Sequence, residues 1–147
     1  MNPRIWGPLT WDIIHNLKIR HKNNKNFIIF MLHFSNILPC SMCKKHMKKI
    51  IINGYKNQIN PLHLNIKSQQ DFFIWTYNFH HCVNLHKNKY NKSPNINLIF
   101  NHYNNTKNNN LKNIQTFLKI SSSFINNTNI FSYNFFILNY NKYLDIK

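Results

Sequence analysis

Apolar residues recur at intervals of three or four along most of the chain, which is the spacing of one face of an α-helix. The first helix is predicted over residues 8–21, with Pro8 in its first turn, where a missing backbone N–H costs nothing. The second is predicted over residues 25–37 and ends before Pro39, because the residue preceding a proline avoids the helical region. The positions that define these two faces are Leu9, Ile13 and Leu17, followed by Phe27, Phe30, Met31 and Phe34.

A third helix is predicted to start at the Cys40-x-x-Cys43 segment and to end at Asn53, with Gly54 as its C-cap. Cys43 falls on the buried stripe of this helix, whereas Cys40 sits at the N-terminus, where the chain emerges. The residues of the stripe are Cys43, Met47, Ile50 and Ile51. A loop is expected to follow over residues 54–67.

The fourth predicted helix has the clearest start. Ser68 and Asp71 have the three-residue spacing of an N-terminal capping box, and the helix is expected to run to about Lys87. The residues of its apolar stripe are Phe72, Trp75, Phe79, Cys82 and Val83. Four helices joined by short connections predict an all-α fold, a compact four-helix bundle.

Composition changes after residue 92, where Asn becomes more frequent and Ser93-Pro94 marks a boundary. We therefore expect a helical domain over residues 1–92 and an Asn-rich C-terminal extension over residues 93–147. Within the extension we expect a short helix over 95–103, a loop over 104–110, and one or two further helices over 111–120 and 130–144. These helices would pack on the bundle or on a partner, and the sequence assigns them no role.

The chain carries 19 Lys and Arg against 3 Asp and Glu, for a net charge of +16. Such a charge would suit nucleic acid, but Lys is spread along the chain and no nucleic-acid-binding motif is visible. Asn, Lys, Ile, Phe and Tyr share AT-rich codons, so much of the charge is attributable to the composition of the genome. The densest group, Lys44, Lys45, Lys48 and Lys49, is expected to be a solvated helix face. We expect no specific nucleic-acid partner.

No targeting or membrane-spanning segment is evident. The longest apolar stretch, residues 27–34, is far shorter than the roughly 20 residues that a transmembrane helix needs. The N-terminal residues lack the apolar core of a signal peptide. We expect a protein without a membrane span, kept in a cytosol-like compartment.

The chain has three cysteines, too few for a disulfide scaffold, and in a cytosolic protein a Cys-x-x-Cys pair is more often redox-active or metal-binding. A cysteine at a helix N-terminus faces the positive end of the helix dipole, which stabilises a thiolate. An exposed Cys40 could exchange with an outside protein, and a buried Cys43 could pass electrons inward. The pair would also fit half of a zinc site, with further ligands from His46, His80, His81 and Cys82.

Zinc is disfavoured, because Cys40 and Cys43 followed at once by His46 would be an unusual ligand spacing. We therefore expect no metal. A non-enzymatic protein that binds zinc or associates with nucleic acid through its basic charge stays open as the alternative at this point.

Three segments, taken together, carry a resemblance to a known family. They are Trp6-Gly7-Pro8-Leu9-Thr10-Trp11 before His15, Leu38-Pro39-Cys40-Ser41-Met42-Cys43 before His46, and Trp75 to Asn84. Their order and spacing resemble the Erv/ALR family of FAD-linked sulfhydryl oxidases over about residues 4–92, and particularly its small versions in large DNA viruses. The third segment resembles the His-Asn-x-Val-Asn signature of the family, read here as His80, His81, Cys82, Val83 and Asn84.

The resemblance implies a helical bundle that holds FAD at its mouth, usually as a homodimer. Cys43 would be the flavin-proximal cysteine and Cys40 the substrate-facing one. The residues that would line the FAD site are Gly7, Thr10, Trp11 and His15 from the first helix, and His80, Val83 and Asn84 from the fourth. Lys89 would lie near the phosphates or ribose of the cofactor.

Several positions depart from the family pattern. His81 replaces the usual Asn, and Lys87 stands where a Leu is expected. No second cysteine pair is present to act as an internal shuttle, so the Cys40–Cys43 disulfide must meet an external dithiol directly. Without the resemblance, Trp11 and Trp75 would be read as core residues, and His15 and His80 as hydrogen-bonded core histidines. Cys82 is expected to be a plain buried or semi-buried thiol, with an intermolecular bond as the alternative that the sequence leaves open.

The resulting hypothesis is an FAD-dependent sulfhydryl oxidase. It would form disulfides in a small dithiol protein, thioredoxin-like or with another Cys pair, and O2 would accept the electrons to give H2O2. A viral protein of this kind would act in the host cytoplasm and in the virion, where the compartment itself does not form disulfides.

Overall fold

The structure of the chain is a computed structural model that describes residues 2–19, 24–87, 93–105 and 110–144. Its helices are α1 (Pro3–Asn16), α2 (Asn24–Asn36), α3 (Ser41–Asn53), α4 (Leu62–Asn65), α5 (Gln69–Lys87), α6 (Ile96–Asn105), α7 (Asn110–Ser122) and α8 (Ile130–Asn139), followed by a 3-10 turn, η1 (Tyr140–Lys142). The fold of the described residues is all-α, as predicted. No helix in these ranges is long and apolar enough to cross a membrane.

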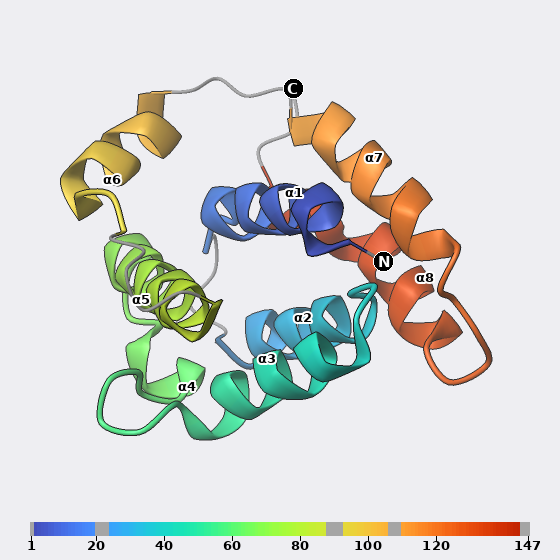
Figure 1. The fold of residues 1–147 in the computed structure, drawn as a ribbon, viewed down its shortest axis with the longest axis horizontal. Helices are drawn as coiled ribbons and strands as arrows, with labels where there is room; N and C mark the ends of the chain where they lie inside the picture. The colour runs from blue at the N-terminus through green and yellow to red at the C-terminus, as the bar shows by residue number, and fades with distance from the viewer. Residues whose placement is uncertain (1, 20–23, 88–92, 106–109, 145–147) are drawn as a thin grey trace.

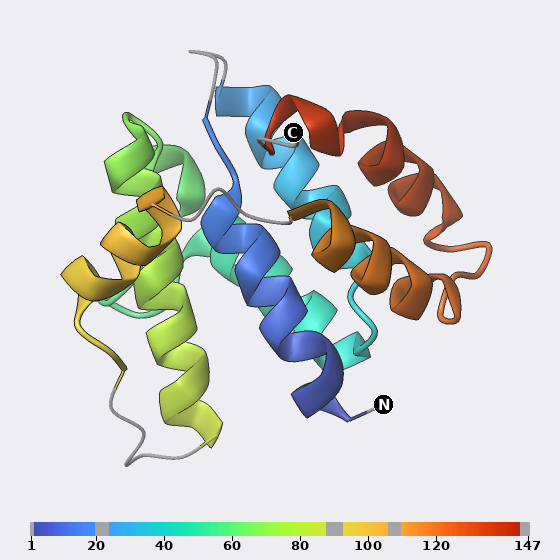
Figure 2. The same cartoon turned by 90° about the horizontal axis from the view of Figure 1, so that it is seen from above.

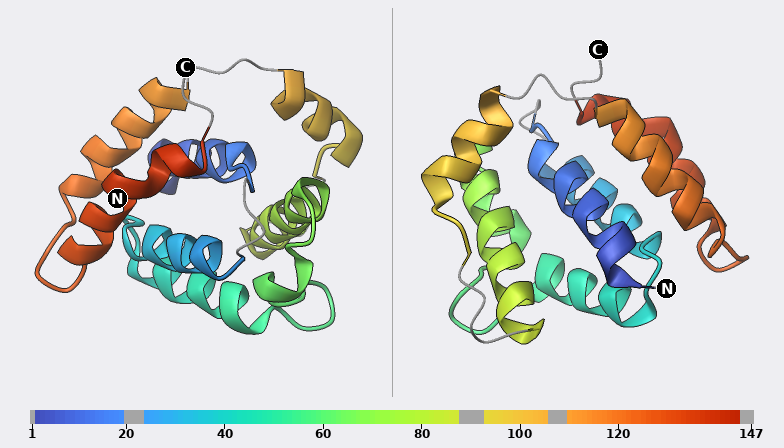
Figure 3. Two further views of the ribbon diagram at one scale, coloured as in Figure 1. Left: turned by 180° about the vertical axis from the view of Figure 1, so that it is seen from behind. Right: turned by 45° about the horizontal axis from the view of Figure 1, so that its top comes forward.

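Helix α1 lies in the middle of the molecule, with α5 on one side and α7 on the other (Figure 1). Helices α2 and α3 pack against each other, and the short α4 joins them to α5, so that α1, α2, α3 and α5 form the predicted bundle. Helix α7 packs on α1 (Figure 2), and α8 packs on α2 (Figure 3). The helices of the C-terminal extension therefore pack on the bundle, and α6 lies against α5.

Helix α1 begins earlier than the sequence predicts. The side chain of Asn2 caps it by accepting a hydrogen bond from the Arg4 N–H at 3.0 Å. Pro3 occupies the first turn, the position predicted for Pro8, which instead lies inside the helix. The predicted start at Pro8 was wrong because Pro3 and Asn2 supply a complete N-terminal signal upstream of it.

Helix α1 also ends earlier than predicted, at Asn16. The Lys18 N–H donates to the carbonyl of Tyr143 at 2.6 Å, and the Ile19 N–H donates to the side chain of Gln69 at 2.8 Å. Both N–H groups thus have hydrogen-bond acceptors outside α1, so the chain does not need to stay helical to satisfy them. Apolar spacing could not reveal this, because both acceptors lie far away in sequence.

Helix α3 has the predicted boundaries. The sulfur of Cys40 caps its N-terminus by accepting the Cys43 N–H at 3.1 Å. At the other end Gly54 has a φ of 73°, and a Cβ at this position would overlap the carbonyl oxygen of Ile59. Only glycine fits here, because other residues rarely adopt this backbone conformation and have no room for a side chain.

Helix α5 starts with the predicted capping box. The Ser68 hydroxyl accepts the Asp71 N–H at 3.0 Å and also hydrogen-bonds its carboxylate at 2.8 Å. The segment before it, residues 54–67, was predicted to be a loop and instead contains α4. An isolated antiparallel bridge between Tyr55 and Ile59 turns the chain back towards α4, and the Leu62 side chain at the start of α4 is fully buried.

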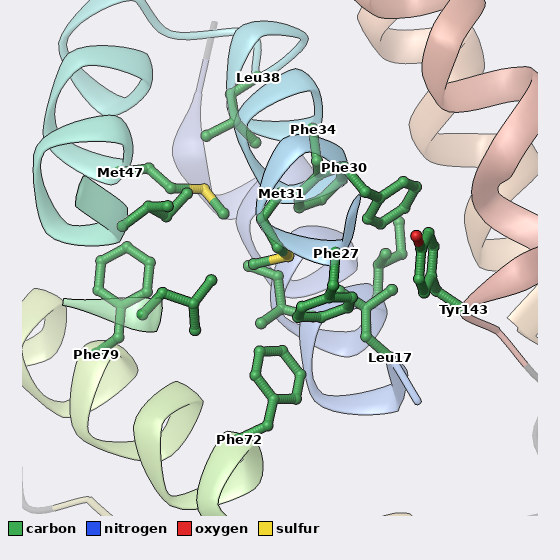
Figure 4. Packing of buried hydrophobic residues seen from close by; sticks show 14 of the residues in the cluster. Leu17, Phe27, Phe30, Met31, Phe34, Leu38, Met47, Phe72, Phe79 and Tyr143 are labelled. Atoms are coloured by element: carbon green, nitrogen blue, oxygen red, sulfur yellow. The ribbon is translucent and has the colours of Figure 1, made fainter. Parts of the chain in front are cut away.

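The aromatic core is shared by the bundle and the extension. Figure 4 shows Phe27 and Phe30 of α2 packed between Phe72 of α5 and Tyr143, which comes from the end of the chain. The ring centroid of Tyr143 lies 4.6 Å from that of Phe30 and 5.2 Å from that of Phe27. The C-terminal segment thus closes one side of the core that α2 and α5 build.

Helices α7 and α8 bury aromatic side chains in the same core. Phe117 of α7 and Phe136 of α8 are both 0% exposed, and their ring centroids lie 5.4 and 5.2 Å from that of Phe34 in α2. A polar contact adds to this packing, since the Asn113 amide donates to the Asp12 carboxylate of α1 at 2.7 Å. The extension is therefore part of the hydrophobic core and not a separate layer.

Candidate active site

The two cysteines of the Cys-x-x-Cys segment form a disulfide at the N-terminus of α3. Cys40 is extended, with φ −150°, and follows the buried Pro39, while Cys43 lies in the first turn of the helix. Both cysteines are half-buried, and Met42 between them is 79% exposed. When the disulfide opens, the unpaired N–H groups and dipole of α3 stabilise a thiolate at this position.

A pocket of about 120 Å³ lies between α1, the start of α3 and α5. Cys43 lines it and Cys40 does not, so the disulfide joins the pocket to the outer surface. The predicted cofactor residues on its wall are Gly7, Thr10, Trp11, Cys43 and Val83. The pocket is also lined by Leu38 from the connection between α2 and α3, by Met47 of α3 and by Phe79 of α5 (Figure 4).

The pocket has the chemistry that a planar, redox-active ring requires. Its walls are aromatic and aliphatic, and one of them carries the Cys43 sulfur. Trp6 is 6% exposed and lines the pocket, and its indole N–H has no partner among the described residues. A Cβ added at Gly7 would meet no atom within 4 Å, so the backbone leaves open space there.

These residues fit FAD, because aromatic walls hold a flat ring and a buried N–H without a partner calls for an acceptor on a ligand. The pocket is smaller than the roughly 300–1,000 Å³ typical of cofactor sites, so it accommodates only part of FAD. Trp6 is one of the pocket residues that the sequence did not predict as a site residue. It stands in the Trp6-Gly7 motif and one helical turn before Thr10, whose hydroxyl donates to the Trp6 carbonyl at 3.0 Å.

Behind the pocket, the buried side chain of His15 belongs to a chain of hydrogen bonds between α1 and α5. The Thr76 hydroxyl donates to the carbonyl of Phe73 at 2.8 Å, so towards His15 it can only accept. Nδ1 of His15 therefore donates to Thr76 at 3.0 Å. Nε2 of His15 then accepts from Nδ1 of His80 at 3.2 Å, which fixes the ring of His80.

The fixed ring of His80 stacks on Trp11, which lines the pocket. The two ring centroids are 3.9 Å apart and the planes differ by 8°. Tyr103 of α6 covers His15 from the other side, with ring centroids 5.0 Å apart. The structure therefore brings His15 and His80 next to the pocket, where the His15–His80 hydrogen bond orients the ring that stacks on Trp11.

Burial, and next to it the charge of His80, lower the pKa of His15 to about 3 from its usual value of 6.5. His15 is therefore neutral in the folded protein, as its acceptor role towards His80 requires. In the unfolded chain it takes up a proton below about pH 6.5.

We expect the free energy of unfolding to fall as the pH drops from about 6.5 towards 3. In this range the unfolded chain binds one more proton at His15 than the folded protein, so acid favours unfolding by on the order of a few kcal/mol. Urea unfolding between pH 7 and pH 4 measures this slope. His15→Gln should reduce the slope and the control His63→Gln, at an exposed position, should leave it unchanged. Equal slopes in His15→Gln and the unaltered protein would contradict this assignment.

Two predicted site residues, Asn84 and Lys89, and the unusual His81 belong to α5 or follow it in the sequence. Asn84 is half-buried on α5, one turn after His80, and does not line the pocket. Lys89 lies outside the described residues. His81, which departs from the family signature, makes a 2.7 Å hydrogen bond between its Nδ1 and the Ser93 hydroxyl. Its side chain therefore ties α5 to the segment before α6.

Cys82 is a buried free thiol, as predicted, and lies 7% exposed with its sulfur 3.4 Å from the side-chain oxygen of Gln58. Burial raises the pKa of this thiol, an effect that the charge of Lys56 partly offsets. Within the described residues no three His, Cys, Asp or Glu side chains gather to hold a metal ion. Cys40 and Cys43 are bonded to each other, so neither sulfur is a free thiolate that could bind zinc in this structure.

Comparison with known proteins shows the family to which the chain is similar. Residues 8–101 match the Erv1 / Alr family. An FAD-linked sulfhydryl oxidase of African swine fever virus, from a Kenyan pig isolate, is 34% identical over 90 residues, which cover 57% of this chain and 69% of the relative. The protein of the same name from a Malawian tick isolate is 33% identical over 90 residues, with the same coverage. No solved structure gives a significant match.

Proposed function

Because the chain belongs to the Erv1/Alr family, we propose that Cys40 and Cys43 form the redox disulfide of an FAD-linked sulfhydryl oxidase. The protein is a flavin-linked thiol oxidase by its family and by its similarity to viral enzymes of that name. The proposed roles rest on one observation, which is that the two bonded cysteines lie in different surroundings. Cys43 lines the apolar pocket, and Cys40 lies outside it beside the exposed Met42.

Residues of this chain would hold FAD from two helices. Trp6, Gly7, Thr10 and Trp11 of α1 would contact it together with His15 behind them, and His80, Val83 and Asn84 of α5 would close the opposite side. Lys89 is proposed as the residue nearest the phosphates or ribose. When bound, FAD accepts two electrons from the reduced cysteine pair and delivers them to O2, which becomes H2O2.

The exchange steps follow from the positions of the two sulfurs. A substrate thiolate attacks Cys40, the S–S bond breaks, and Cys43 leaves as a thiolate that the N-terminus of α3 stabilises. The second substrate thiol then attacks the mixed disulfide, which releases Cys40 and leaves the substrate oxidised. The pair returns to the disulfide when it gives up two electrons and two protons, so one substrate disulfide forms for each O2 reduced.

The partners and the place of action are also proposals. The substrate is a small dithiol protein, thioredoxin-like or with another Cys pair, because no second cysteine pair in this chain could relay electrons to Cys40. We propose a homodimer, which light scattering on the purified protein would detect. The relatives named above are viral proteins. We propose that this protein acts in the host cytoplasm and in the virion, where infected-cell fractionation should find it.

The decisive test of the function is spectroscopic. The purified protein should be yellow, with a flavin absorption band, and should consume oxygen when a dithiol is added. A colourless protein that binds zinc and unfolds on chelation would instead support the non-enzymatic alternative and overturn the oxidase proposal.

Replacing Trp6 with Phe is expected to weaken FAD binding by about two- to tenfold. Phe keeps the aromatic wall and removes the buried N–H, so a net hydrogen bond of about 0.5–1.5 kcal/mol is lost. Titration of the apoprotein with FAD, followed by flavin fluorescence, measures the dissociation constant. Trp75→Phe is the matched control, because the Trp75 N–H already donates to the Asn60 carbonyl at 3.0 Å outside the pocket. An unchanged dissociation constant in Trp6→Phe would show that this N–H does not reach the cofactor.

A further inference from the structure

We propose that the exposed surface of α3 beside the disulfide docks the substrate and selects dithiols carried on acidic protein segments. The proposal rests on the oxidase function above and names its substrate class. The surface, called here the α3 lysine face, is defined by Met42, Lys44, Lys45, Lys48 and Lys49. Its centre is the stripe formed by Met42, Lys45 and Lys49.

The α3 lysine face starts at the disulfide itself. Cys40 caps α3, and the stripe follows it at the i, i+3 and i+7 positions, so Met42, Lys45 and Lys49 point to the same side. All three are exposed. At 1.5 Å per residue the stripe extends about 10 Å along the helix. A peptide whose cysteine reaches Cys40 can therefore continue over both lysines.

No carboxylate in the described part of the chain lies on α3 to neutralise this charge. The helix contains four lysines and neither Asp nor Glu. Asp12 is on α1, where the amides of Asn16 and Asn113 donate to it at 3.3 and 2.7 Å. Asp71 is on α5, where it forms the capping box with Ser68. The positive potential beside Cys40 therefore stands without an intramolecular counter-charge from these residues.

Cations on this surface are close enough to repel one another. Burial, and next to it the charge of Lys48, lower the pKa of Lys44 and also that of His33 on the neighbouring helix α2. Carboxylates of a bound partner would relieve this repulsion, and opposite charge also speeds the encounter of two proteins. Charge complementarity thus indicates an acidic occupant.

The apolar residue of the face indicates a protein occupant. Met42 lies between the two cysteines and leaves 79% of its surface to solvent. A flexible thioether adapts its shape to varied apolar partners. Nucleic acid would use the lysines alone, whereas a dithiol protein would contact Met42 each time it exchanges with Cys40. We therefore assign the face to a protein segment.

Three peptides of equal length test the proposal, each with one Cys-x-x-Cys pair and with acidic, neutral or basic flanks. Oxygen consumption gives kcat/KM for each peptide, and the uncharged dithiol dithiothreitol serves as the reference. The reaction of each peptide with a small uncharged disulfide corrects for its intrinsic thiol reactivity. At low ionic strength we expect kcat/KM to be about tenfold or more higher for the acidic than for the basic peptide. High salt should shrink this ratio.

The double variant Lys45→Glu, Lys49→Glu should reduce or invert the ratio of acidic to basic peptide. Both residues are exposed, so the variant is expected to fold. The matched control is Lys112→Glu, Lys119→Glu on α7, which changes the net charge by the same amount and also at two exposed positions. Helix α7 packs on α1 and is drawn at the upper right of Figure 1, whereas α3 runs along the bottom, so the control should keep the wild-type ratio.

The outcomes separate docking from catalysis. Normal turnover of dithiothreitol with equal kcat/KM for the acidic and basic peptides would overturn the docking proposal and leave the oxidase function standing. Absence of dithiothreitol turnover would overturn both. If the α3 variant loses binding of a short DNA duplex but keeps the peptide selectivity, the α3 lysine face would bind nucleic acid and the proposal would be overturned. Loss of the ratio in the α3 variant alone supports it.

Discussion

Replacing Cys43 with Ser should abolish the oxidation of every dithiol, small or large, while FAD stays bound. Serine nearly preserves the volume of the side chain on the pocket wall, so the flavin absorption band should persist. The disulfide with Cys40 cannot form, and no thiol then lines the pocket to pass electrons inward. Oxygen consumption with dithiothreitol, measured beside the absorption spectrum of the same sample, separates lost chemistry from lost cofactor.

Cys82→Ser is the matched control for this experiment. Cys82 is buried on α5 and hydrogen-bonded to Gln58, and it does not line the pocket. Its variant should retain both FAD and turnover. Normal turnover in Cys43→Ser would show that the assignment of the redox pair is wrong.

Phe117→Ala in the C-terminal extension is expected to lower the free energy of unfolding of the whole protein by about 3–5 kcal/mol. Phe117 is 0% exposed and packs against Phe34 of the bundle and Phe136 of α8. A loss of this size is a large share of the roughly 5–15 kcal/mol that stabilises a typical domain. Chemical denaturation followed by circular dichroism measures it.

The control is Phe131→Ala on α8, where the ring is 70% exposed, so the loss should be small. One cooperative transition is expected in all three proteins, because the bundle and the extension share one core. Two separate transitions, with Phe117→Ala shifting only one of them, would show that residues 93–147 fold on their own.

The sequence predicts the parts of this fold that depend on local signals. The apolar spacing of Phe27, Phe30 and Phe34 gave α2 within a residue at each end, and the Ser68–Asp71 capping box gave the start of α5. The placement of Cys43 on the inner side of α3 also followed from spacing alone. These signals act within one helix, so no knowledge of its neighbours was needed.

What the sequence could not predict depends on contacts between distant segments. The end of α1 is set by Tyr143 and Gln69, and no periodicity in α1 itself reports them. The direction of the hydrogen bonds from His80 through His15 depends on Thr76, which had no assigned role. Motif matching can name the histidines, but only geometry shows which nitrogen donates.

The pairing of Lys18 with Tyr143 bears on how the protein is synthesised. Once α5 has been synthesised, the nascent chain contains the three segments that resemble the oxidase family, but the rings of Phe27 and Phe30 still lack Tyr143, which covers them. At roughly 5–20 residues per second, the remaining residues take several seconds to emerge. During this interval the nascent chain exposes apolar aromatic surface, so a chaperone that shields it until Tyr143 has emerged should raise the yield of active enzyme.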